Sequence, residues 1–193
     1  MRLSFLGLGT MGTPMALNLS RQFPVTIWNR SPSKCTPLRQ KGLTIGETPA
    51  KVASQSDIIF TMLFDGPAVE SILTPEFKSA LRGKTLINTS SVIVECSHCL
   101  ASQVHAVGVH FIEMPVSGSK VPVEQGRLVG MLAGDPVVVE RVRPAVKPLT
   151  AAVVYCGPIG FGLTMKYAVN LYLITMTVGL AESVNLASAQ GWI

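Results

Sequence analysis

The sequence is short of charged and aromatic side chains: 14% of its 193 residues are Asp, Glu, Lys or Arg, and 6% are Phe, Trp or Tyr. With 48% hydrophobic residues, this composition excludes an intrinsically disordered chain. Lysines and arginines form no run, so the net charge of +5 favours small anionic ligands and does not indicate nucleic-acid binding. Repeats and low-complexity tracts are absent. These absences leave a globular chain of one large domain, or of one domain and an extension.

Cysteines and long apolar runs are also scarce. Four cysteines are too few for a disulfide framework in a chain of this length, and such usage is typical of a reducing cytoplasm. The N-terminus does not have the pattern of a signal peptide. The longest apolar run, residues 167–181, is shorter than the roughly 18 residues of a membrane span. We therefore expect a cytoplasmic protein, no membrane association, and a buried helix over this run.

Potential metal ligands concentrate in one place, Cys96-Ser-His98-Cys99. A structural zinc ion needs four ligands, and the chain has no second pair to complete such a set. We expect no metal site, with these side chains serving as packing and surface residues. His105 and His110 have no acid or nucleophile nearby in sequence, and we expect them to be structural or exposed.

Strand patterns alternate with helical spacing along most of the chain. Strands are predicted at residues 3–6, 25–28, 57–63, 85–88, 109–113, 129–133 and 153–156, and helices at 12–21, 49–54, 67–73, 94–107 and 136–147. This alternation predicts an α/β fold of the Rossmann type, with a doubly wound, mostly parallel sheet covered on both faces. From about residue 160 the alternation stops, and one long helix is predicted to about residue 190. The predicted division is a dinucleotide-binding domain, residues 1–160, followed by this helix, residues 161–193.

A glycine motif follows the first predicted strand and opens the first helix: Gly7-Leu8-Gly9-Thr10-Met11-Gly12. Gly7 permits a tight turn, Gly9 lets the backbone approach a pyrophosphate, and Gly12 lets helix and strand pack closely. The alternative is a glycine-rich turn without function. Because the motif occupies the first strand-to-helix turn, we predict that these six residues bind a dinucleotide.

The end of the second predicted strand indicates which dinucleotide. NAD sites usually place an Asp or Glu there to hold the ribose hydroxyls, but this chain has Asn29-Arg30-Ser31. Arg30 can bind a 2′-phosphate through two hydrogen bonds, and Asn29 and Ser31 can add others. The alternative is an exposed loop arginine. We predict NADP(H) as the cofactor.

Two further segments carry candidate chemistry. In Pro115-Val-Ser117-Gly118-Ser119, which follows a strand, the Ser117 hydroxyl and the amides of Gly118 and Ser119 can bind a small carboxylate, although an ordinary turn explains the spacing equally well. In the long helix, Lys166 and Asn170 are four residues apart and share one face. An amine and an amide there suggest proton transfer to or from an oxygen, although a surface lysine is the commoner case.

Together these segments resemble the β-hydroxyacid dehydrogenase family, in family order and over nearly the whole chain. The resemblance implies that Ser117 and Gly118 bind the substrate carboxylate, that Lys166 is the catalytic acid/base, and that Asn170 positions the reacting oxygen. It also places the strand end Met62-Leu63 and the turn residue Ser91 in the cofactor groove. The match is nearest to the NADPH-dependent glyoxylate/succinic semialdehyde reductase branch. Val169 replaces the first of the family's two adjacent asparagines.

The resemblance implies a small carboxylate-bearing aldehyde or hydroxyacid as substrate. Three hypotheses remain open: a glyoxylate/succinic semialdehyde reductase, a 3-hydroxyisobutyrate or tartronate semialdehyde dehydrogenase, and a cofactor-binding module without turnover. Imine reduction is a more distant alternative. A 6-phosphogluconate-type enzyme is disfavoured, because that branch has a His-Asn pair where this chain has Val169-Asn170.

The chain is shorter than the family pattern, in which the long helix begins an all-helical domain that closes the active site. A helix that is apolar on nearly every face must be buried, and little of this chain remains to cover it. We expect either a truncated product or a homo-oligomer in which the C-terminal helix packs against a partner chain. The wall that would depress the pKa of Lys166 is expected to come from outside this chain.

Overall fold

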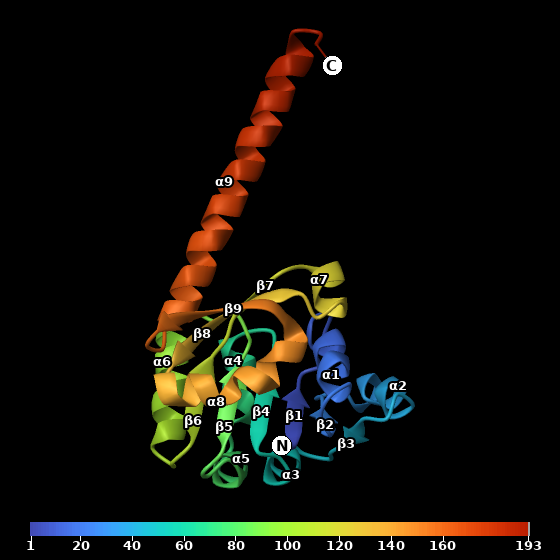
Figure 1. Ribbon diagram of the computed structural model, residues 1–193, viewed down its shortest axis with the longest axis vertical. Coiled ribbons are helices and arrows are strands. Elements are labelled where there is room, and N and C mark those ends of the chain that lie inside the picture. Colours follow the sequence, from blue (N-terminus) through green and yellow to red (C-terminus); the bar gives the residue numbers. More distant parts are fainter. Residues whose placement is uncertain (193) are drawn as a thin grey trace.

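The computed structural model describes residues 1–192, and within this range nine strands form one sheet (Figure 1). Ile193, the last residue of the predicted C-terminal segment, lies outside the described residues. The strands are β1 (Leu3–Leu6), β2 (Val25–Trp28), β3 (Thr44–Ile45), β4 (Ile58–Thr61), β5 (Thr85–Asn88), β6 (His110–Glu113), β7 (Val116–Ser117), β8 (Leu128–Gly134) and β9 (Thr150–Gly157).

Helices connect most of these strands. They are α1 (Gly12–Ser20), α2 (Thr36–Arg39), α3 (Pro49–Ser54), α4 (Gly66–Ile72), α5 (Pro75–Ala80), α6 (Val94–His105), α7 (Lys120–Glu124), α8 (Pro136–Val146) and α9 (Phe161–Ala189), with short 3₁₀ turns at Pro32–Lys34 and Lys147–Leu149.

The strand order is that of a Rossmann fold. Six strands run parallel in the order β3-β2-β1-β4-β5-β6. β8 then runs antiparallel to β6 and β7, and β9 is parallel to β8. The predicted doubly wound, mostly parallel sheet is therefore confirmed, and the antiparallel part at one side was not predicted. The carboxyl ends of the six parallel strands share one edge, where such folds bind ligands.

Both faces of the sheet are packed. Leu3 and Phe5 of β1 point into a core closed by α1, α2, α7 and α8, whereas Leu6 points into a second core closed by α3 to α6. Phe5 stacks on Phe60 of β4 with ring centroids 6.1 Å apart. Burial on both faces explains why β1, β4 and β5 are almost continuously apolar.

Short elements account for most differences from the predicted ones. β3 and β7 have two residues each, too few to show a strand period, and α2, α5 and α7 have four to six residues. The segment after Pro115, considered as a turn, contains β7, whose Ser117 pairs with Val129 of β8. The strand predicted over residues 57–63 is shorter, because β4 ends at Thr61 and the chain then lines a cavity.

The long helix α9 extends away from the body of the protein (Figure 1). Residues 167–181 are not buried within this chain: Leu171 is 68% exposed and Leu180 is 65% exposed. This agrees with the expectation that little of the chain remains to cover the helix, and cover from a partner chain stays a prediction. Gly162 and Leu163, in the first turn, are the buried residues of this helix. The physical reason is that α9 packs on β8 and β9 only near its start.

By length and composition, α9 is the single helix in the described part of the chain that could cross a membrane; its mean hydropathy reaches 1.2 over 18 residues, none of them buried. Core helices of soluble proteins meet the same criterion, so this property assigns no location to the chain.

Candidate cofactor and substrate site

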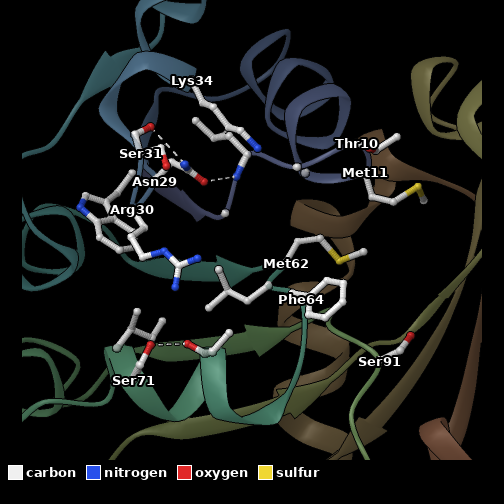
Figure 2. A pocket seen from close by; sticks show the side chains of 18 residues that line it. Thr10, Met11, Asn29, Arg30, Ser31, Lys34, Met62, Phe64, Ser71 and Ser91 are labelled. Carbon is white, nitrogen blue, oxygen red and sulfur yellow. Dashed lines mark hydrogen bonds between the residues drawn. The ribbon is translucent and has the colours of Figure 1, made fainter.

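A cavity of about 490 Å³ opens where β1, β2 and β4 end. The twelve residues predicted to bind the cofactor all lie on its wall: Gly7, Leu8, Gly9, Thr10, Met11, Gly12, Asn29, Arg30, Ser31, Met62, Leu63 and Ser91. They come from four separate segments of the chain, and the parallel order of the strands brings them together. Figure 2 shows their side chains around the cavity.

Each glycine of the first turn has a distinct geometric reason. Gly7 has a φ of +102°, and a Cβ there would lie 2.8 Å from Leu63 Cδ2 and closer still to the Met62 carbonyl oxygen. At Gly12 a Cβ would collide with the Gly7 carbonyl, so helix and strand can approach only without it. At Gly9 a Cβ would meet nothing within 4 Å. Gly7 and Gly12 are thus needed by the fold, whereas Gly9 leaves space on the cavity side.

The N-terminus of α1 remains available to a ligand. Among residues 1–192, no side chain caps it, and its first turn has no acidic residue. By contrast, α3, α4, α5 and α8 are capped by Thr48, Asp65, Thr74 and Asp135. Free N–H groups and the positive end of a helix dipole attract anions, so the start of α1 suits a phosphate group.

Asn29 joins the second strand to the glycine turn. Its Oδ1 accepts a hydrogen bond from the Leu8 amide at 2.8 Å, and its Nδ2 donates to the Ser31 carbonyl at 3.1 Å (Figure 2). The side chain expected to contact the cofactor therefore has its oxygen engaged within the protein. What it can offer a ligand is the second N–H of its amide.

Positive charge lines the cavity beside this turn. Arg30 and Lys34 both belong to the wall, are both exposed, and lie close to Ser31 (Figure 2). Among the described residues, the wall contains no Asp or Glu. Two cationic side chains and no carboxylate on this part of the wall can hold an anionic group of a ligand.

The sequence did not predict every residue of the wall. Lys34 lines the wall but was not assigned to the site. Its position four residues after Arg30 was the signal in the sequence, and the structure places it at the end of a short 3₁₀ turn. Phe64, 93% exposed, follows Leu63 directly and gave a signal only through that position. The remaining unpredicted wall residues are Trp28, Ala68, Ser71 and Ile72.

The predicted substrate residues lie outside this cavity, on and just after β7. Ser117 is half-buried in the strand, and Gly118 and Ser119 are exposed. Gly118 has a φ of +137°, and a Cβ there would lie 2.7 Å from Leu128 Cδ2. The turn itself therefore requires this glycine, whatever it binds.

Lys166 and Asn170 are half-buried in α9, whose early part packs on β8, the strand that pairs with β7. Burial lowers the pKa of the Lys166 amine below its ordinary value. Part of the desolvation expected from outside the chain is therefore supplied by the chain itself. A hydrogen bond from the Tyr167 hydroxyl to the Val92 carbonyl fixes this turn to the loop that carries Ser91.

The cysteine-rich segment of α6 packs against these elements. Cys96 lies against Gly66 of α4, and His98 lies against Gly160 before α9. Across residues 1–192, no three His, Cys, Asp or Glu side chains gather as metal ligands. All four cysteines are free, and both His105 and His110 are exposed.

Comparison with known proteins gives consistent relatives. The chain is 35% identical to a chloroplastic glyoxylate/succinic semialdehyde reductase 2 of Arabidopsis thaliana, over 98% of this chain and 54% of that protein. It is 36% identical to 2-hydroxy-3-oxopropionate reductase of Escherichia coli K12, over 99% of this chain and 66% of the relative. A Mycobacterium tuberculosis 3-hydroxyisobutyrate dehydrogenase structure with L-serine matches all of this chain and 67% of its own, with a TM-score of 0.94 and 26% identity.

These relatives are oxidoreductases of the hydroxyacid dehydrogenase type, which confirms the resemblance drawn from the motifs. The chain spans about half to two thirds of the length of the curated relatives. A family model described as the NAD binding domain of 6-phosphogluconate dehydrogenase matches residues 2–157. With that match over most of its length, the chain belongs to this family of dehydrogenase NAD-binding domains.

Proposed function

We propose that the chain forms the cofactor-binding part of an NADPH-dependent reductase of small aldehyde-acids, with Lys166 as the proton donor. The observation that carries this proposal is the cavity: an uncapped helix start, an open position at Gly9, and Arg30 with Lys34 on a wall that lacks carboxylates within residues 1–192. These features fit a phosphate-bearing dinucleotide.

The predicted roles of the chain's residues follow from their chemistry. Bound NADPH supplies the hydride that reduces a carbonyl carbon. The oxygen then needs a proton, which the Lys166 ammonium can give; its lowered pKa makes it a better acid near neutral pH. Asn170, on the same helix face, can donate a hydrogen bond to that oxygen. The Ser117 hydroxyl and the Gly118 amide can hold the substrate carboxylate.

The substrate class rests on the relatives. Their names refer to glyoxylate, succinic semialdehyde, 2-hydroxy-3-oxopropionate and 3-hydroxyisobutyrate, and the site residues inferred here suit a carboxylate next to a carbonyl or hydroxyl group. We propose a glyoxylate or succinic semialdehyde type of substrate, with the 3-hydroxyisobutyrate and tartronate semialdehyde types as near rivals.

A second candidate is a cofactor-binding module without turnover. It is favoured by α9, whose apolar side chains beyond the second turn remain exposed, and by the part of the relatives' length that this chain does not span. In that case the cavity binds NADPH, but nothing closes over Lys166.

The two candidates are separated by one experiment on the full chain. NADPH oxidation is followed by absorbance with glyoxylate, succinic semialdehyde and tartronate semialdehyde, beside an NADPH titration by fluorescence. Turnover with one of these substrates supports the reductase. Saturable binding without turnover supports the module, and absence of binding contradicts both.

We also propose that α9 is covered by a second copy of the chain, since its exposed leucines and methionines and Ile174 form an apolar surface. Light scattering at micromolar concentration should give a dimer or a larger oligomer. A monomer would contradict this part of the proposal.

A further inference from the structure

A fully buried carboxylate, Glu113, lies at the end of β6 and contacts the start of α9. Its Oε1 accepts a hydrogen bond from the Leu163 amide at 2.8 Å. Its Oε2 accepts from the Gly160 amide at 3.1 Å and also from the Ser97 hydroxyl. Burying a charged carboxylate is unfavourable unless donors surround it, and here three donors do so.

The start of α9 depends on this carboxylate. Gly160, its N-cap, has a φ of +94° and provides no side chain to bond the free amides of the first turn. These amides need an acceptor, and negative charge at a helix N-terminus is favourable. Glu113, 47 residues earlier in sequence than Gly160, supplies both the acceptor and the negative charge.

The glycines before Lys166 are explained by the same packing. A Cβ at Gly162 would lie 2.9 Å from Glu113 Oε1 and 2.7 Å from the Met131 carbonyl oxygen. A Cβ at Gly160 would lie 2.8 Å from His98 Nε2 on α6. Both glycines therefore let α9 begin directly against the carboxylate and α6.

Glu113 also stands next to the predicted substrate loop. Its backbone is held in the sheet between Asn88 of β5 and Ala133 of β8, and Pro115 follows two residues later. Lys166 stands three residues after the anchored Leu163 amide, less than one helical turn away. One side chain therefore joins the sheet edge that carries Ser117 to the helix that carries Lys166.

We propose that Glu113 is a positioning residue: it closes the N-terminus of α9 and fixes Lys166 relative to the loop that carries Ser117 and Gly118. The catalytic part of this inference rests on the proposed function, whereas the anchoring of α9 does not. Glu113 does not belong to the wall of the cofactor cavity. A purely structural role predicts that cofactor binding and turnover decline together, and a positioning role predicts that turnover declines alone.

The test uses the full chain with Glu113→Gln, Glu113→Asp and Ser97→Ala. The matched control is Glu140→Gln, which removes an exposed carboxylate on α8 that bonds only to Arg143 among the described residues. Hydrogen exchange is measured at the Gly160 and Leu163 amides, with the Val139 amide of α8, bonded to the Asp135 carbonyl, as the internal reference. The Lys166 amine is titrated by NMR, and kcat and NADPH affinity are measured separately.

In Glu113→Gln we expect exchange at the Gly160 and Leu163 amides to rise about tenfold or more, because a charge-assisted bond is lost and an amide N–H₂ faces a donor. The pKa of Lys166 should move up toward its ordinary value as water reaches the loosened turn. kcat should fall about ten- to a hundredfold, with NADPH affinity within about twofold of the wild type and partial recovery in Glu113→Asp.

Unchanged exchange at both amides, or parallel loss of NADPH affinity and kcat, overturns the proposal. Changed exchange with an unchanged Lys166 titration overturns the positioning role. If the wild type turns over none of the substrates, the proposed function fails, while the exchange and titration results still decide the anchoring. If Glu113→Gln does not fold, Ser97→Ala decides: it removes one of three donors and should raise exchange at the same two amides a few-fold.

Discussion

Two helices of this protein begin at glycine-rich turns, and their N-termini meet opposite electrostatic conditions. α1 begins beside the cavity. In the part of the chain that the structure describes, no side chain caps its N-terminus and no acidic residue lies in its first turn. α9 begins against the buried carboxylate of Glu113, which accepts hydrogen bonds from two of its amides. The N-terminus of α1 is available to an anion, whereas the N-terminus of α9 already contacts one, the Glu113 carboxylate.

A glycine turn before a helix therefore has no single function. An N-terminus left without a carboxylate attracts a ligand's phosphate, and an N-terminus closed by a buried carboxylate is fixed in place. We propose that the uncapped N-terminus of α1 binds the cofactor and that Glu113 at the N-terminus of α9 holds Lys166 in place.

The largest effect is expected from removing the Lys166 amine on α9. Lys166→Ala should lower kcat about 10²–10⁴-fold, the range of general acid catalysis, because the reacting oxygen loses its proton donor. NADPH affinity should stay within about twofold, since Lys166 does not line the cavity. Steady-state kinetics and fluorescence titration measure both. Near-normal kcat would exclude Lys166 as the acid.

The second-largest effect is expected from placing a carboxylate at the uncapped N-terminus of α1. Thr10→Glu places a carboxylate beside the α1 N-terminus, as Glu113 does at α9, and Thr10→Gln is the neutral control of similar size. NADPH affinity should fall about tenfold or more in the first variant, because the new charge repels a phosphate and competes for the same amides. Equal affinities for the two variants would show that no phosphate lies at this end.

A smaller effect is expected at Gly9. Gly9→Ala adds a methyl group that meets nothing in the protein within 4 Å, so the free energy of unfolding should change by less than about 0.5 kcal/mol. The methyl group points where the ligand is proposed to approach, so NADPH affinity should fall roughly tenfold, about 1.4 kcal/mol. Gly179→Ala, a methyl group added in α9 far from the cavity, is the control for NADPH affinity only. A stability loss at Gly9 without loss of affinity would contradict its ligand role.

The pH dependence of turnover is the smallest expected effect. Carbonyl reduction needs the protonated amine, so kcat should fall as pH rises through the pKa of Lys166. Burial lowers that pKa, which places the fall below the ordinary lysine value of about 10.4. In the oxidation direction the neutral amine is needed, and the rate should rise through the same pKa. In Lys166→Arg this pH dependence of kcat should disappear, because arginine stays charged over the whole pH range measured.

Much of the fold and of the cavity could be predicted from the sequence because these features depend on local order. The G-x-G-x-x-G turn and Arg30 stand at the ends of consecutive parallel strands, and a parallel sheet aligns those ends at one edge. Their meeting in one cavity therefore follows from the strand pattern alone.

What could not be predicted depends on contacts between distant segments. The role of Glu113 requires knowing that the end of β6 meets the start of α9, and nothing in the spacing of the sequence shows this contact. The same holds for Asn29, whose oxygen bonds to the Leu8 amide. The apolar pattern of α9 indicates that the helix needs cover, but it does not show what supplies that cover.

We expect the uncapped N-terminus of α1, together with Arg30 on the same cavity wall, to hold NADP(H), and a cofactor titration decides this. NADPH and NADH are titrated against the wild type, Arg30→Ala and the control Arg39→Ala, an exposed arginine of α2 outside the cavity wall, at one fixed ionic strength. We expect the wild type and Arg39→Ala to bind NADPH about tenfold or more tightly than NADH. Arg30→Ala should lose most of this preference, since a charge-assisted bond contributes about 1.5–3 kcal/mol. Equal affinity of the wild type for the two cofactors, or an unchanged preference in Arg30→Ala, would contradict it.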